Sequence, residues 1–205
     1  LFMGVGGYIT GGLHAYFGLP PVLTILIGTL GGAAICTLLL LPTLPLRGIY
    51  FAIVTLVYPL LLSRMIVAIG ILGGTDGLPG LATFPNIWVD LYLAIGVTLV
   101  VLFALRRLVN EDIGLVFRGV KDNDQSVRAS GMSVTWYKAQ ALFIASAIGC
   151  FAGAYLCHLY GWVGISYFAL DFSILPIAAA VLGGMGTLVG PLLGSVILVP
   201  LSEVL

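Results

Sequence analysis

Long apolar segments separated by short polar stretches dominate the chain. A helix that crosses a bilayer needs about 20 apolar residues, and four segments are close to that length: 22–41, 49–69, 88–105 and 139–160. Pro59 predicts a kink in the second of them, because proline removes a helical hydrogen bond. The pattern predicts an all-α fold, a polytopic transmembrane helical bundle in which residues 1–205 form a single domain.

The apolar segments near the two ends are irregular. Residues 1–17 are rich in glycine, which favours a helix or a broken helix, and both ends lie inside apolar sequence, so we expect truncated termini and a minimum helix count. Residues 174–182 are too short to cross a bilayer, and Gly183, Gly184 and Gly186 interrupt the chain before it becomes apolar again. This predicts a re-entrant or discontinuous helix of the kind found near transporter substrate paths. Two ordinary helices joined by a tight turn are the alternative.

Composition supports a membrane protein. The chain is 60% hydrophobic and 8% charged, whereas soluble domains carry roughly 25% charged residues. Cys36, Cys150 and Cys157 lie in apolar segments, so we expect buried small side chains rather than metal ligands. We expect His14 and His158 at the membrane interface, without the carboxylate or histidine neighbours that a metal site or proton relay needs.

Small residues recur at helical spacing in two of the apolar segments. Gly28 and Gly32 are four residues apart, as are Ala145, Gly149 and Gly153. Such patterns let helix backbones approach closely. We therefore expect these faces to be helix contacts.

The basic residues are unevenly distributed. Six of the eight lie in residues 106–138, whereas the loops at 70–87 and 161–173 contain none. The excess of lysine and arginine on cytoplasmic loops predicts that 106–138 is cytoplasmic, with Arg47 on the same side. Trp88 and Trp162 then fall at the outer membrane boundary. No basic face wide enough for nucleic acid is present.

The 106–138 loop has the pattern of two short helices. Ile113, Val116, Phe117 and Val120 repeat with helical spacing. Asp122 is placed to cap a second helix, with Gln125 three residues later; Val127 lies on its apolar side, and Gly131 is placed to end it. The apolar side must be covered by the rest of the chain or by a partner's groove.

A few polar residues fall within or beside the apolar segments. A charge inside a membrane span costs at least about 2.5–3.5 kcal/mol on insertion scales, so Arg64 needs a partner, for which Asp76 is a candidate, or must reach the interface. Thr55 and Tyr58 are candidate polar groups of a transport path, although hydroxyl side chains often bond to their own helix backbone.

Five motifs, in order, resemble a known family. They are Gly4-Val5-Gly6-Gly7-Tyr8, residues 46–56, Gly73-Gly74-Thr75-Asp76-Gly77-Leu78, residues 122–132 with Tyr137-Lys138, and residues 182–191. Together they resemble the permeases of branched-chain amino acid ATP-binding cassette (ABC) importers of the LivM type. The chain departs from the family's usual pattern at Asp124, Ser126 and Val127, and at Leu61 and Leu62.

The resemblance implies a multi-pass permease subunit of a bacterial inner (plasma) membrane importer for branched-chain amino acids. It implies separate ATPase subunits, a sister permease and a periplasmic substrate-binding protein as partners, with the lipid bilayer around them. The ATPase-coupling loop would comprise Val116, Val120, Asp124, Val127, Arg128 and Gly131. The chain has no G-x-x-x-x-G-K-[ST] phosphate loop, so we expect no cofactor on it, with ATP bound by the partner subunits.

Three alternatives stay open at this stage. The same family could import urea or short amides, which the sequence does not separate from amino acids. An ATP-independent carrier would usually carry acidic groups within its helices, and Asp76, Asp90 and Asp171 all fall in loops or at boundaries. A membrane-embedded enzyme is disfavoured, because no His/Asp/Glu cluster or Ser-His pairing is evident.

Overall fold

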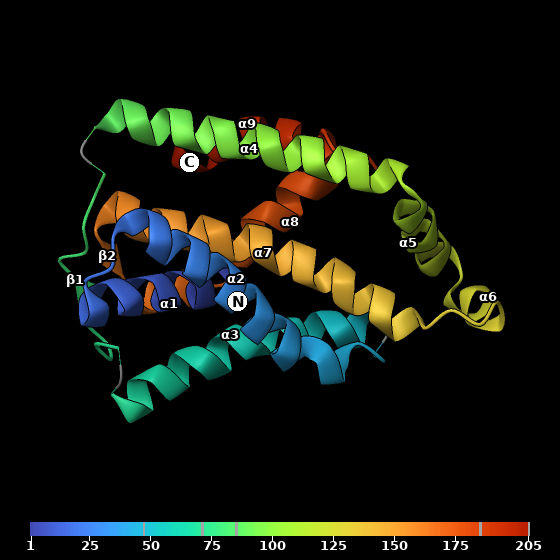
Figure 1. Ribbon diagram of the computed structural model, residues 1–205, viewed down its shortest axis with the longest axis horizontal. Helices are drawn as coiled ribbons and strands as arrows, with labels where there is room; N and C mark the ends of the chain where they lie inside the picture. The colour runs from blue at the N-terminus through green and yellow to red at the C-terminus, as the bar shows by residue number, and fades with distance from the viewer. Residues whose placement is uncertain (47, 71, 85, 185, 205) are drawn as a thin grey trace.

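The computed structural model describes residues 1–46, 48–70, 72–84, 86–184 and 186–204, so Arg47 and Met185 lie outside the described residues. The described residues form nine α-helices with two short 3-10 helices and one two-stranded pairing, which confirms the all-α prediction (Figure 1). The helices are α1 (Phe2–Phe17), α2 (Pro21–Leu40), α3 (Ile49–Ile69), α4 (Ile87–Asn110), α5 (Asp112–Asp122), α6 (Asp124–Ala129), α7 (Val134–Tyr160), α8 (Asp171–Gly183) and α9 (Gly190–Val204). The smaller elements are η1 (Leu41–Thr43), β1 (Leu78–Pro79), β2 (Trp162–Val163) and η2 (Ile165–Phe168).

Four helices are long and apolar enough to cross a bilayer: Pro21–Thr43, Ile49–Ile69, Ile87–Asn110 and Val134–Tyr160. These match the four predicted spans with shifted ends. α4 continues past Leu105 and carries Arg106 and Arg107 on its last turns, while α7 begins five residues before Ala139. α3 continues as one helix through Pro59.

The packed centre of the molecule consists of α1, α2 and α7. α1 is a continuous helix that packs against both of the others, with its glycine-rich face buried. Cys36 of α2 and Cys150 and Cys157 of α7 are all fully buried in this centre, as the sequence predicted.

Glycine permits this packing because backbones meet with no side chain between them. A methyl group on Gly6 would overlap the backbone of Cys150, and one on Gly153 would overlap the carbonyl of Met3. Gly28 of α2 instead leaves room for the side chain of Thr10 of α1. The predicted small-residue contacts are therefore real helix crossings, although Ala145 itself is exposed.

A cap closes one end of the centre. β1 pairs antiparallel with β2, placing Leu78 opposite Val163, and the Leu81 N–H donates to the Gly161 carbonyl at 3.0 Å. Val163 is fully buried against the glycine face of α1. The cap and the α5–α6 helices lie at opposite ends of the molecule (Figure 1).

α8 and α9 fold back on each other as a hairpin. A methyl group on Gly183 would overlap the Gly190 carbonyl, and one on Gly194 would overlap the Ala179 carbonyl, so the two backbones are in direct contact. α8 has 13 residues, which is about 20 Å of helix and less than the roughly 30 Å of a bilayer core. Gly184 leaves α8 with φ 100°, a backbone conformation that favours glycine. Re-entry into a membrane stays a prediction.

The outer helices expose apolar side chains. None of the residues of α4 is buried, and α3 buries only Pro59 and Ser63. In water such surfaces would be costly. They fit a lipid environment or a partner protein.

Candidate functional site

The 106–138 loop folds into α5 and α6, which project from the end of the molecule where α4 ends and α7 begins (Figure 1). Two short helices were predicted there, and two are present. α5 is amphipathic, with Val116 and Val120 half-buried and Leu115 exposed. The loop is therefore a folded element rather than a linker.

The cap of α6 differs from the prediction. Asn123, not Asp122, stands before the helix, and its side-chain oxygen accepts from the N–H groups of Gln125 at 3.0 Å and Ser126 at 3.3 Å. Asp122 instead ends α5. The two candidates are adjacent and both residue types cap helices well, so the sequence pattern could not distinguish them.

Val127 joins the two short helices. Its side chain is 8% exposed and lies so close to α5 that a methyl group on Gly119 would sit 3.2 Å from it. Gly131 follows α6 with φ 80°, as expected of a residue just past a helix end. Val127 therefore stabilises the loop from inside, and Arg128 beside it is exposed.

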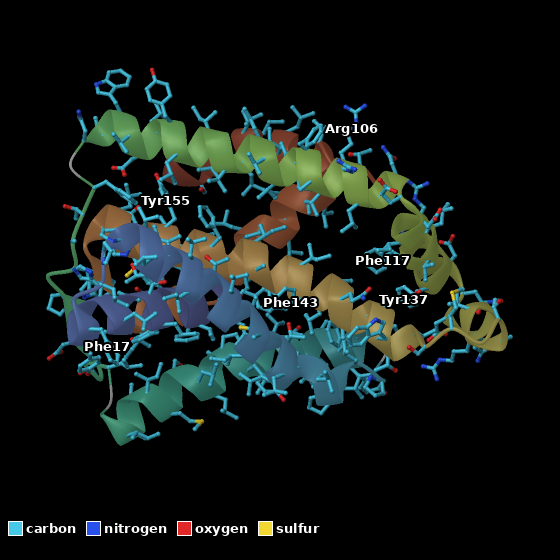
Figure 2. All side chains as sticks on the ribbon, viewed as in Figure 1. Phe17, Arg106, Phe117, Tyr137, Phe143 and Tyr155 are labelled. Carbon is cyan, nitrogen blue, oxygen red and sulfur yellow. The ribbon has the colours of Figure 1, made fainter. Side chains whose placement is uncertain are left out.

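Two contacts attach the loop to α7. The Lys138 Nζ lies 3.7 Å from an Asp124 carboxylate oxygen, and both side chains are largely buried. The rings of Phe117 and Tyr137 meet edge to face with centroids 6.4 Å apart (Figure 2). A displacement of α5 or α6 would thus reach a membrane-spanning helix directly.

The exposed surface of this end includes residues that the sequence pattern did not single out. Leu115 is 63% exposed and Trp136 is 62% exposed. Leu115 lies outside the apolar face of α5 that Val116 and Val120 share, and this position in the pattern could have predicted its exposure. An exposed tryptophan is typical of a protein contact surface.

A cavity of about 400 Å³ lies between α1, α3, α7 and α8. Its lining is mainly apolar and includes Thr55 and Ser173. The Thr55 hydroxyl donates to the Ala52 carbonyl at 2.9 Å, which satisfies its proton but leaves it able to accept. Tyr58, also a candidate, is half-buried one turn further along α3 and does not line this cavity.

Tyr167 also lines the cavity, at its boundary with the cap. Its hydroxyl donates to the Trp162 carbonyl at 3.1 Å. Burial raises the pKa of Tyr167 well above its ordinary value, in keeping with a neutral hydroxyl that donates this bond.

Arg64 and Asp76 are not brought together as an ion pair. In the described part of the chain the ion pairs are Lys138–Asp124 and Arg107–Glu111. Arg64 is exposed on α3, and the Asp76 carboxylate accepts from Thr75 at 3.3 Å. Arg64 was expected either to pair with Asp76 or to reach the membrane interface, and its exposure agrees with the second expectation.

The expectation that neither histidine has a histidine neighbour is wrong, whereas their place at a membrane interface stays a prediction. His158 is fully buried, and its ring lies against that of His14 with centroids 5.6 Å apart. His158 Nδ1 lies 2.7 Å from the Ala82 carbonyl, while the Ala82 N–H donates to His14 Nε2 at 3.1 Å. The residues are 144 positions apart in sequence, so only the fold reveals the pair. No cluster of three or more metal-ligating side chains occurs among the described residues.

The whole chain, residues 1–205, matches the family model described as "Branched-chain amino acid transport system / permease component". The chain belongs to this family. Members of this permease family are components of transport systems rather than enzymes, and the four apolar helices agree with a membrane protein.

Curated relatives of this permease carry the same description. The chain is 28% identical over 235 residues to the high-affinity branched-chain amino acid transport system permease protein LivM of Salmonella typhimurium, and equally to that of Escherichia coli. It is 25% identical over 216 residues to the probable LivM permease of Methanocaldococcus jannaschii. The chain spans 55% of the first two proteins and 63% of the third. No solved structure matches it significantly.

Proposed function

We propose that this chain is the transmembrane permease subunit of an ABC importer that moves branched-chain amino acids across the bacterial inner membrane. Separate ATPase subunits supply the energy, a sister permease completes the path, and a periplasmic substrate-binding protein delivers the substrate. The chain itself binds no cofactor in this proposal, because ATP is held by the partner subunits.

The observation that carries the proposal is the α5–α6 pair. It is a folded, partly apolar element at the end of the spans, with Leu115 and Arg128 open to a partner, and Trp136 at the start of α7 is exposed as well. Its inner side is tied to α7 through Asp124 and Lys138. A partner groove that grips these helices would move α7 with them.

The space around the loop allows such movement. A cleft of about 770 Å³ is lined by the loop, by the chain between α2 and α3, and by the start of α3 and of α7. Its walls include Asp124, Lys138, Leu44 and Phe51. Closure of this cleft when ATP binds to the ATPase would change the tilt of α7 and switch access between the two sides.

The cavity between α1, α3, α7 and α8 suits an aliphatic amino acid. Its volume of about 400 Å³ lies within the range of small-molecule sites. Apolar walls accept the side chain, and hydroxyls such as those of Thr55 and Ser173 solvate the charged end briefly without trapping it.

The test is uptake of labelled leucine into vesicles that contain the full-length chain, its sister permease and the ATPase subunits. The binding protein is added outside, and ATP is present or absent inside. Excess unlabelled valine and excess urea are run as competitors. We expect uptake that requires ATP and is blocked by valine but not by urea.

Two results would revise the proposal. ATP-dependent uptake of urea or a short amide, without leucine uptake, would retain the importer and replace its substrate. Uptake that ignores both ATP and the ATPase subunits would identify an independent carrier and overturn the importer.

A further inference from the structure

The two histidines hold both backbone groups of one peptide unit. Ala82 lies in the strap, defined here as residues 78–84, which leads from the cap to α4. Its N–H donates to His14 Nε2 at 3.1 Å, and its carbonyl lies 2.7 Å from His158 Nδ1. His14 comes from α1 and His158 from α7, so the strap is fastened to two helices of the packed centre.

The partners determine where the proton of His14 lies. The Ala82 N–H can only donate, so Nε2 of His14 must present its lone pair. Nδ1 of the same ring lies 2.8 Å from the Leu19 carbonyl, which can only accept, so Nδ1 carries the hydrogen. His14 is therefore neutral in this arrangement, and a second proton would set an N–H against the N–H of Ala82.

His158 responds differently to a proton. Its Nδ1–H donates to the Ala82 carbonyl, and its Nε2 lies 2.8 Å from the Thr24 hydroxyl, which can either donate or accept. A protonated His158 could keep both partners, because the Thr24 hydroxyl can instead donate to the Pro21 carbonyl at 2.9 Å. The loss of a hydrogen bond on protonation is thus specific to His14.

The titratable surroundings of this pair are sparse. α1 contributes His14, α7 contributes His158 and the buried thiol of Cys157, and α2 contributes the Thr24 hydroxyl. Among the described residues, no carboxylate, lysine or arginine is hydrogen-bonded or ion-paired to either imidazole. No neighbouring negative charge is therefore available to stabilise an imidazolium at His14.

The strap leads into α4 and so fixes the position at which that helix begins. The ring of Phe84 lies against His158, with centroids 6.1 Å apart, and the Tyr155 hydroxyl donates to the Asp90 carbonyl at 3.0 Å. None of the residues of α4 is buried, so these contacts at its beginning hold it on the centre.

We propose that His14 is a positioning residue of the transport cycle: its neutral ring helps to hold the strap, and through it the start of α4, and its protonation weakens that hold by one hydrogen bond. The direction of the pH effect follows from linkage. The arrangement in which the strap is bound requires a neutral His14 ring, so a falling pH favours the arrangement in which this hydrogen bond is lost. The inference about uptake rests on the proposed importer.

The experiment compares wild type with His14→Gln and His14→Ala in the full-length chain, assembled with its partner subunits in nanodiscs. Glutamine can accept from the Ala82 N–H and donate to the Leu19 carbonyl, and it does not titrate. The first readout is hydrogen-exchange protection of the 78–84 peptide at pH 7.5 and pH 5.5, corrected for intrinsic exchange. The second is ATP-dependent uptake into vesicles with outer pH varied and inner pH fixed.

We expect protection in wild type to fall about tenfold at the lower pH, the order expected when a buried donor loses its partner. His14→Gln should stay protected at both values, and His14→Ala should be unprotected at both. Uptake should fall with pH in wild type and much less in His14→Gln. Equal pH profiles for wild type and His14→Gln, in both readouts, would overturn the inference.

The exchange readout keeps this inference separate from the proposed function. If ATP-dependent uptake is absent even at pH 7.5, the importer proposal fails, and the protection factors alone decide the role of His14. If uptake is present but strap protection in wild type does not change with pH, the importer stands and the positioning role of His14 is wrong.

Discussion

Replacing Gly6 with alanine tests whether the contact between α1 and α7 depends on the absence of a side chain. The new methyl group would overlap the backbone of Cys150, which cannot rotate away as a side chain could. Overpacking of a filled interior costs about 1–3 kcal/mol, whereas alanine gains up to about 1 kcal/mol over glycine in a helix. The clash should outweigh the helix propensity, lowering the free energy of unfolding by up to about 2 kcal/mol.

Gly31→Ala is the matched control. Gly31 lies within α2, and a methyl group there would meet no atom within 4 Å. Stability should stay the same or rise by up to about 1 kcal/mol. Both variants would be unfolded by SDS titration in mixed micelles and compared with wild type. If Gly6→Ala proves as stable as Gly31→Ala, the close backbone crossing does not hold this fold together.

Three further predictions concern the 106–138 loop. Asn123→Ala removes the cap of α6 and should destabilise that helix by about 1 kcal/mol, seen as faster hydrogen exchange over residues 124–129; unchanged exchange would contradict it. Val127→Asp buries a charge between the two short helices and should uncouple ATP hydrolysis from uptake while membrane insertion stays normal; full uptake would sink the idea. Charge reversal of Asp124 or of Lys138 should each reduce uptake, and the double reversal should restore part of it, unless the pair plays no part in coupling.

The sequence predicted the membrane spans because their signal is local. Each span is a run of apolar residues whose length relative to the bilayer decides the outcome. The two short helices at 112–129 were also predictable, since the spacing of Val116 and Val120 reports a helix period. Their ends were less certain, and Asn123 replaced Asp122 as the cap because adjacent residues of similar capping preference compete for one position.

Features that depend on distant residues were not predictable. Nothing in the residues around His14 or His158 indicates that their rings meet, since the contact requires α1 and α7 to lie side by side. The burial of Val127 depends likewise on the return of α6 onto Gly119. A pattern of apolar positions shows which face of a helix is buried but not which element covers it.

α4 is attached to the rest of the molecule at its two ends, and none of its residues is buried. It can therefore act as a lever. With 24 residues it is a stiff rod about 36 Å long, held at one end around Asp90 by Tyr155 and joined at the other to α5 through Glu111. A push on α5 should therefore pivot the rod about its held end rather than bend it. A rotation of about 10° would move the α5 end of the helix by about 6 Å. A small tilt of α4 is therefore enough to produce a large displacement at that end.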